Sequence, residues 1–244
     1  MDIPFDLHKT VASYLVKPKM KLLDWIPENK LDWYYLSKNP NAIHILEANP
    51  KKIKWHVMSN NHNAIHMLEA NPNKIDWEYL SANPNALNLL EANPDKIVWS
   101  QLSANPEALH LLVVNPDKID WKWLSANPKA LHLLEANPDK INWHLLSKNP
   151  NAIHLLEANP DMIDWYYLET NTGALHLLEK NRKEIDWFWV SGNSEALHLL
   201  KKNPTRINWR HFSGNPNIFE LDKNQYKIDI IEKANILDTL LYKN

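Results

Sequence analysis

Apolar and polar residues recur along this chain in a unit of 22 residues, Ile-Asp-Trp-x-x-Leu-Ser-x-Asn-Pro-x-Ala-Leu-His-Leu-Leu-Glu-Ala-Asn-Pro-Asp-Lys. The clearest copy runs from Ile119 to Lys140. Its apolar positions do not alternate, and Ala, Leu and Glu favour helix over strand. Each copy therefore predicts two short helices, which are unstable alone and must be held by neighbouring copies. The pattern predicts an all-α protein, an α-solenoid of two-helix repeats.

Two residue types mark the register of these repeats. Trp recurs every 22 residues in nine copies, at Trp33, Trp55, Trp77, Trp99, Trp121, Trp143, Trp165, Trp187 and Trp209. Asn follows six places after each Trp, at Asn39, Asn61, Asn83, Asn105, Asn127, Asn149, Asn171, Asn193 and Asn215. A second Asn follows sixteen places after the first eight Trp residues, from Asn49 to Asn203. We expect both Trp and Asn ladders to be structural, with the Asn side chains pairing backbone groups of adjacent repeats.

The Asn-Pro steps predict where the helices end and begin. Asn tolerates the left-handed conformation that ends a helix, and it is also a good N-cap. Pro suits the first helical position because its missing N–H would have no partner there. Asp120 suits the N-cap of the helix that begins at Trp121. Replacing Asn127 by Ala is expected to cost about 1–2 kcal/mol through the lost cap.

The pattern changes at both ends of the chain. We predict an N-terminal cap with a degenerate repeat over residues 1–31, eight to nine repeats over residues 32–216, and a C-terminal capping helix region over residues 217–244. Such terminal units would cover the open apolar ends of a solenoid. At the usual helix spacing the array would be a rod or arc about 70–90 Å long. Its handedness and curvature stay open.

A helical wheel for the first helix places Trp, the Leu three places later and the Ser four places later in the core. The position two after Trp falls opposite and is largely aromatic, which is typical of interface anchors. The alternative is that these side chains pack on the same position of adjacent repeats. The position one after Trp varies most and faces solvent or a partner. The candidate partner-binding stripe is Tyr34, Tyr35, Tyr79, Trp123, Tyr167 and Trp189.

The second helix carries a ladder of histidines opposite its apolar face. Its members are His44, His66, His110, His132, His154, His176 and His198, with Asn88 in the gap. A metal array is disfavoured because stacked helices would hold successive rings about 9–10 Å apart. A pH-sensing stripe is a second interpretation. We favour a hydrogen bond from each His to a carbonyl or Glu of the neighbouring repeat.

Composition argues against several functional classes. The net charge is −2 and the Lys and Arg residues are dispersed, which disfavours a nucleic-acid partner. Cys is absent, and no metal, cofactor, phosphate-loop or hydrolase motif is found. No signal peptide or membrane span is predicted, so we expect a soluble intracellular protein without a membrane partner. Departures from the repeat gather in residues 169–184, where Thr172 and Arg182 replace Pro. A bend or looser packing is expected there. Glu169 and its polar neighbours form no recognisable catalytic pair.

The segment Leu22-Leu23-Asp24-Trp25-Ile26-Pro27-Glu28-Asn29-Lys30-Leu31-Asp32-Trp33 and the repeated Leu-Ser-x-Asn-Pro-Asn-Ala-Ile-His-Leu-Leu-Glu-Ala-Asn-Pro-Asp-Lys-Ile-Asp-Trp resemble a tandem-repeat family of giant DNA viruses that infect amoebae and algae. The resemblance covers residues 22 to about 216 and implies a viral origin, in the host cytoplasm or virion. It supplies no catalytic site. We predict a non-catalytic scaffold that binds a host or viral protein. A structural spacer or cement protein of the virion is the alternative, and an enzyme with an unrecognised site is a distant third.

Overall fold

The computed structural model describes residues 5–16, 19–181 and 185–242. It divides into two compact units, the repeats of residues 27–217 and a terminal unit built from residues 1–26 and 218–244. Short helices recur at the period of the sequence, so the predicted all-α solenoid is confirmed. In the described part of the chain, no helix combines the length and apolar character needed to cross a bilayer.

We number the repeats 1 to 9 by their Trp residues. Each repeat begins with a first helix: α2 (Trp33–Lys38), α4 (Trp55–Met58), α6 (Trp77–Ser81), α8 (Trp99–Ser103), α10 (Trp121–Leu124), α12 (Trp143–Leu146), α14 (Trp165–Leu168), α16 (Trp187–Val190) and α18 (Trp209–Phe212). Repeats 1 to 8 continue into a second helix: α3 (Ile43–Ala48), α5 (Ile65–Glu69), α7 (Leu87–Glu91), α9 (Leu109–Val114), α11 (Leu131–Glu135), α13 (Ile153–Ala158), α15 (Leu175–Lys180) and α17 (Leu197–Lys202). Pro-led 3-10 turns, such as Pro40–Ala42 and Pro50–Lys52, join many of these helices.

Side-chain caps explain the helix boundaries. Asp120 caps α10 by accepting a hydrogen bond from the Trp123 N–H, as predicted. Asn127 accepts from the Lys129 N–H and so caps the turn that leads into α11. The expected left-handed Asn is wrong, because no described residue has a positive φ. Extended backbone at Asn39 (φ −76°, ψ 117°) makes the break instead.

The first-Asn ladder does more than cap helices, since each amide also crosses to the preceding repeat. Asn127 Nδ2 donates to the carbonyls of Ser103 and Asn105, at 3.0 and 2.9 Å. The same pair of bonds recurs at all nine first-Asn positions. For Asn39 of repeat 1 the acceptors are Ser213 and Asn215 of repeat 9, at 3.0 and 2.9 Å. The ladder therefore has no free end, and the repeats form a closed ring.

Other repeat contacts close in the same way. The Ser hydroxyl of one repeat accepts from a backbone N–H of the next, and Ser213 accepts from the Asp32 N–H at 2.8 Å. Asn41 Nδ2 donates to the Pro216 carbonyl at 2.9 Å. The expectation of an open rod or arc is thus wrong. Because repeats 1 and 9 cover one another, the ring has no open apolar end that a cap would need to cover.

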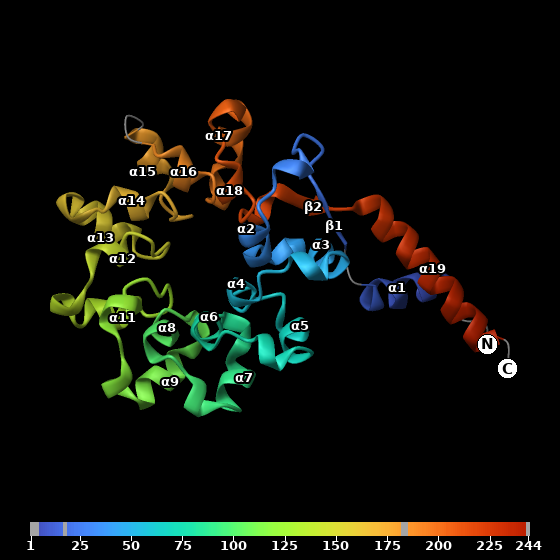
Figure 1. Cartoon of the computed structure of the whole chain (residues 1–244), viewed down its shortest axis with the longest axis horizontal. Coiled ribbons are helices and arrows are strands. Elements are labelled where there is room, and N and C mark those ends of the chain that lie inside the picture. The colour runs from blue at the N-terminus through green and yellow to red at the C-terminus, as the bar shows by residue number, and fades with distance from the viewer. Residues whose placement is uncertain (1–4, 17–18, 182–184, 243–244) are drawn as a thin grey trace. The chain divides into compact units, whose positions relative to one another are not determined.

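First helices line the inner side of this ring, and second helices lie on its outer side (Figure 1). The residues that recur as fully buried are the Leu three places after Trp, the Ser, the first Asn, the Ala just before the second helix and the central Leu of that helix. Trp itself is only half-buried in most repeats, which corrects the expectation of a core position. A cation from the following turn covers its ring in four repeats, such as Lys140 at 4.3 Å from the Trp121 centroid.

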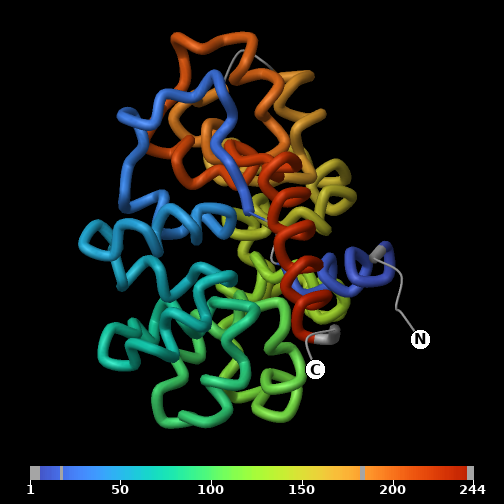
Figure 2. The backbone as a smooth tube through the Cα atoms, turned by 90° about the vertical axis from the view of Figure 1, so that its right-hand side faces the viewer, coloured from blue at the N-terminus to red at the C-terminus, as the bar shows by residue number. Residues whose placement is uncertain are grey.

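The terminal unit joins the two ends of the chain. Helix α1 (Phe5–Leu15) packs beside α19 (Lys223–Tyr242), which Figure 2 shows as the blue and red helices. Strand β1 (Met20–Leu22) pairs antiparallel with β2 (Phe219–Leu221), with Lys21 opposite Glu220. The predicted separate N- and C-terminal caps are therefore parts of one unit.

Candidate functional site

The predicted aromatic stripe belongs to the first helices, which line the inner side of the ring (Figure 1), and its side chains are half-buried. All six of its residues are half-buried: Tyr34, Tyr35, Tyr79, Trp123, Tyr167 and Trp189. The partial burial reflects packing on neighbouring repeats, which the helical wheel of a single repeat does not include. By contrast, the position one after Trp is exposed in seven of nine repeats, in agreement with its variability.

Several aromatic side chains at the position two after Trp pack on one another across neighbouring repeats. The centroids of Trp189 and Tyr35 lie 4.6 and 4.5 Å from that of His211, which occupies the same repeat position between them. The Tyr35 hydroxyl also lies 3.0 Å from His211 Nε2. Burial and the neighbouring Arg210 lower the pKa of His211. The packing alternative is therefore confirmed for repeats 8, 9 and 1, while a binding role for the stripe stays a prediction.

An open hollow of about 320 Å³ lies beside the first helices of neighbouring repeats. Its lining comes from five successive repeats: Lys38, Asn60, Glu78, Tyr79, Ala82, Gln101 and Trp123. Desolvation lowers the pKa of Lys38, and Lys148 of repeat 6 adds repulsion from across the ring. The lining mixes both charges with amides and aromatic rings, so it favours no single ligand class.

The histidine ladder forms the predicted contacts with neighbouring repeats. His66 Nε2 lies 2.9 Å from Glu47 Oε1, and His154 Nε2 lies 3.1 Å from Glu135 Oε1. Three further pairs follow the same pattern: His110–Glu91, His176–Glu157 and His198–Glu179. The hydrogen-bond interpretation is confirmed at these five positions. Within the described ranges, no three His, Asp or Glu side chains gather in an arrangement that could hold a metal ion.

The ring departs from its own pattern around repeat 7. The residue three places before each Trp is Lys or Arg in seven repeats, but it is Met162 before Trp165. Repeats 6 to 8 also carry four exposed large apolar side chains: Met162 (46% exposed), Trp165 (37%), Tyr166 (51%) and Phe188 (38%). Exposed aromatic and Met side chains are typical of interfaces. The expected loosening is not seen at Thr172, because Asn171 keeps both ladder bonds, and Arg182 lies outside the described residues.

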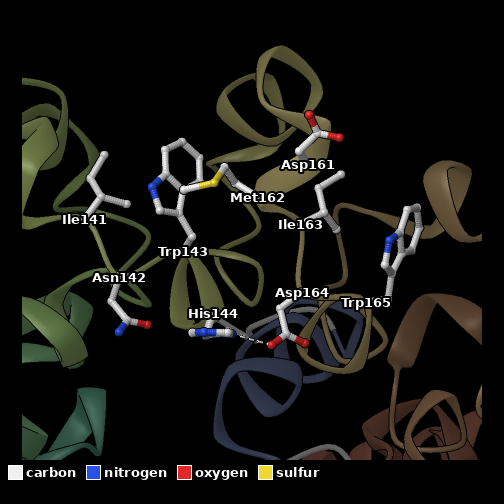
Figure 3. A pocket seen from close by; sticks show the side chains of 9 residues that line it. All are labelled: Ile141, Asn142, Trp143, His144, Asp161, Met162, Ile163, Asp164 and Trp165. Atoms are coloured by element: carbon white, nitrogen blue, oxygen red, sulfur yellow. Dashed lines mark hydrogen bonds and ion pairs between the residues drawn. The ribbon is translucent and has the colours of Figure 1, made fainter.

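A groove of about 590 Å³ opens between repeats 6 and 7. Figure 3 shows Met162 reaching toward the Trp143 ring, with Ile163 between Trp143 and Trp165. In four other repeats a cation lies over the corresponding Trp ring. Along the lower edge of this view His144 Nδ1 pairs with Asp164 Oδ2. The groove thus combines an apolar wall with an acidic and imidazole edge, and its position in the ring is set by α12 and α14.

Beyond Trp165 lies a second, smaller cavity of about 320 Å³, lined by Trp165, Tyr166, Glu169 and Asp186. Glu169 stands where the other eight repeats have the ladder Ser. Its Oε1 accepts from the Asp186 N–H at 2.9 Å, which replaces the Ser contact, but its Oε2 has no hydrogen-bond partner. Burial, with a contribution from the Asp186 carboxylate, raises the pKa of Glu169 to about 7.

Met162 and Glu169 are the residues that sequence reasoning missed as a site. Their signal was departure from the repeat, which was visible at Glu169 but matched no catalytic pair. Stacking brings Glu169 against Asp186, seventeen residues later, and that contact cannot be seen from the sequence of one repeat. No family model, curated protein or solved structure matches this chain.

Proposed function

We propose that the ring is a non-catalytic binding module, and that it docks a protein partner on the groove between repeats 6 and 7. The exposed surface of Met162 and Trp165, which both line this groove, is the observation that carries this proposal. Large exposed apolar side chains beside a concave groove favour association with another protein. The acidic side chains at the groove, Asp161 and Asp164 among them, favour a partner segment with positive charge.

The regular parts of the ring support a scaffold more than an enzyme. The Asn, Ser and His ladders account for most recurring polar side chains as structural contacts. On the resemblance to a viral repeat family, the partner would be a host or viral protein. The closed ring gives little support to the alternative role as a virion spacer. Closure removes the solenoid ends through which an open array could stack.

A pair of reciprocal variants tests the docking groove. Met162→Lys restores the common residue and would place a cation over Trp143, which fills the groove without disturbing the ring. Lys140→Met makes the opposite change one repeat earlier and is the matched control. We expect affinity capture from extracts of infected host cells to recover a protein with the native chain and Lys140→Met, but at least fivefold less of it with Met162→Lys.

Equal recovery with both variants would show that the groove is not the docking surface. High copy number in purified particles, without any groove-dependent partner, would favour the virion alternative. Turnover of a substrate by the purified ring would contradict a non-catalytic role.

A further inference from the structure

The cavity beyond Trp165 holds a carboxyl group without a complete set of partners. Glu169 is 2% exposed, and its Oε2 accepts no hydrogen bond. In the other repeats the Ser hydroxyl at this position both donates to the Trp carbonyl and accepts from the next repeat, as Ser125 does with Trp121 and Asn142. An ionised carboxylate cannot donate, so replacing Ser by Glu leaves one buried acceptor that lacks a donor. Such a group is stabilised by an incoming cation or N–H donor.

The Trp beside this carboxyl also lacks the cation that covers four of the other repeat Trp rings. Lys52, Lys140 and Arg206 lie 4.5, 4.3 and 5.5 Å from the ring centroids of Trp33, Trp121 and Trp187. No described residue places a cation over Trp165, and residue 184, at the corresponding position, is Glu. The exposed Trp165 ring is thus an unoccupied cation–π face next to a buried acceptor.

We propose that the pocket of Trp165, Tyr166, Glu169 and Asp186 binds the cationic head of a Lys or Arg side chain on the protein partner. This proposal rests on the proposed function and names the chemistry that the partner presents. Two carboxyl groups exclude an anionic head, and two aromatic walls favour a cation over a neutral polar group. Trp165 lines both this pocket and the groove, so one partner segment can fill both, with an apolar side chain in the groove and the cation here.

A small probe tests the pocket without knowledge of the partner. Nα-acetyl-lysine methylamide is titrated into the ¹⁵N-labelled full chain, and the Trp165 indole N–H signal, assigned with Trp165→Phe, is followed by NMR. The neutral norleucine analogue is the control for apolar binding. We expect saturable binding of the lysine probe, at least fivefold tighter than that of the norleucine analogue.

Two charge variants locate the effect. Glu169→Gln keeps the shape of the side chain but removes its charge, and Glu169→Ser restores the common residue of the ring. Both are expected to weaken binding of the lysine probe about tenfold while leaving the other indole signals in place. Glu157→Gln is the matched control, since it removes one exposed charge that pairs with His176 outside the pocket. It should bind as the native chain does.

Protonation gives a further readout. Glu169 faces Asp186 as its charged neighbour and Tyr166 as the other titratable lining group. Since a bound cation favours the ionised carboxyl, probe affinity should rise severalfold between pH 6 and pH 8 in the native chain and stay flat in Glu169→Gln.

Equal binding of the lysine and norleucine probes would overturn the proposal, as would native affinity in Glu169→Gln or an equal loss in Glu157→Gln. These outcomes are separable from failure of the docking proposal. If partner capture depends on Met162 but not on Glu169, the groove binds a protein and the pocket takes no cation from it.

Discussion

Repeats 5 and 7 show how one backbone arrangement can carry two different surfaces. In repeat 5, Lys140 covers Trp121 and Ser125 completes its ladder contacts. In repeat 7, Trp165 is uncovered and Glu169 stands in place of Ser. Both repeats nevertheless keep the Leu core and both Asn ladder bonds, so the ring depends on those groups and tolerates change at the Trp cover and the Ser position.

The reason lies in which contacts each position makes. The first Asn bonds three backbone groups in two repeats and is fully buried, so few other side chains can replace it. The Ser position mainly supplies an acceptor to the next repeat, and the carboxylate of Glu169 can do that as well. A repeat can therefore acquire a binding site where the contact is replaceable, without opening the ring.

The largest expected effect on stability concerns the Asn ladder, both where repeats 1 and 9 meet (Asn39) and within the array (Asn127). Asn39→Ala and Asn127→Ala should each lower the free energy of unfolding by about 4 kcal/mol, because each leaves buried backbone groups unpaired. This exceeds the cost expected from the cap alone. Asn137→Ala is the control, since its amide makes a single bond to the Leu133 carbonyl and should cost about 1 kcal/mol. Urea unfolding of the three variants measures the difference.

The comparison of Asn39 with Asn127 tests closure directly. In an open solenoid the Asn39 amide would have no preceding repeat to bind, and its loss would cost little more than the cap. A cost at Asn39 below half of that at Asn127 would therefore contradict the ring.

Much of this fold could be predicted from the sequence, because the repeat encodes its own helices and caps. Asp120 and Asn127 were identified as caps from residue type and spacing. Closure could not be predicted, since it depends on a small rotation between successive repeats that the period does not encode. The bonds of Asn127 to the preceding repeat agree with the expectation that the Asn ladder pairs backbone groups of adjacent repeats. The contact of Glu169 with Asp186 could not be predicted, because it depends on how two repeats stack.

The second effect is a pH dependence of stability that comes from Glu169, at the position where the other repeats have Ser. Its folded-state pKa of about 7 exceeds the ordinary value of 4.5. Below pH 4.5 the carboxyl is protonated in both states, so no stability is lost. As the pH rises from about 4.5 through 7, only the unfolded chain ionises readily, and stability falls by an amount on the order of 3 kcal/mol.

Glu169→Ser should remove this decline and raise the stability of the ring at pH 8, whereas the native chain and the variant should differ little at pH 4.5. Thermal unfolding at several pH values measures both. A variant that declines with pH as steeply as the native chain would place the titrating group elsewhere.

The smallest effect concerns the cation over Trp. Lys140→Met removes the cation from the Trp121 face and should cost about 0.5 kcal/mol, while Met162→Lys should add a similar amount. Opposite signs at equivalent positions would mean that repeat 6 gives up a little stability by placing Met162, rather than a cation, beside the Trp143 ring. Equal signs, or no change at either site, would mean that a cation over Trp does not stabilise the ring. Urea midpoints in low and high salt distinguish these outcomes, because screening should shrink a charge-dependent difference but not one that comes from packing alone.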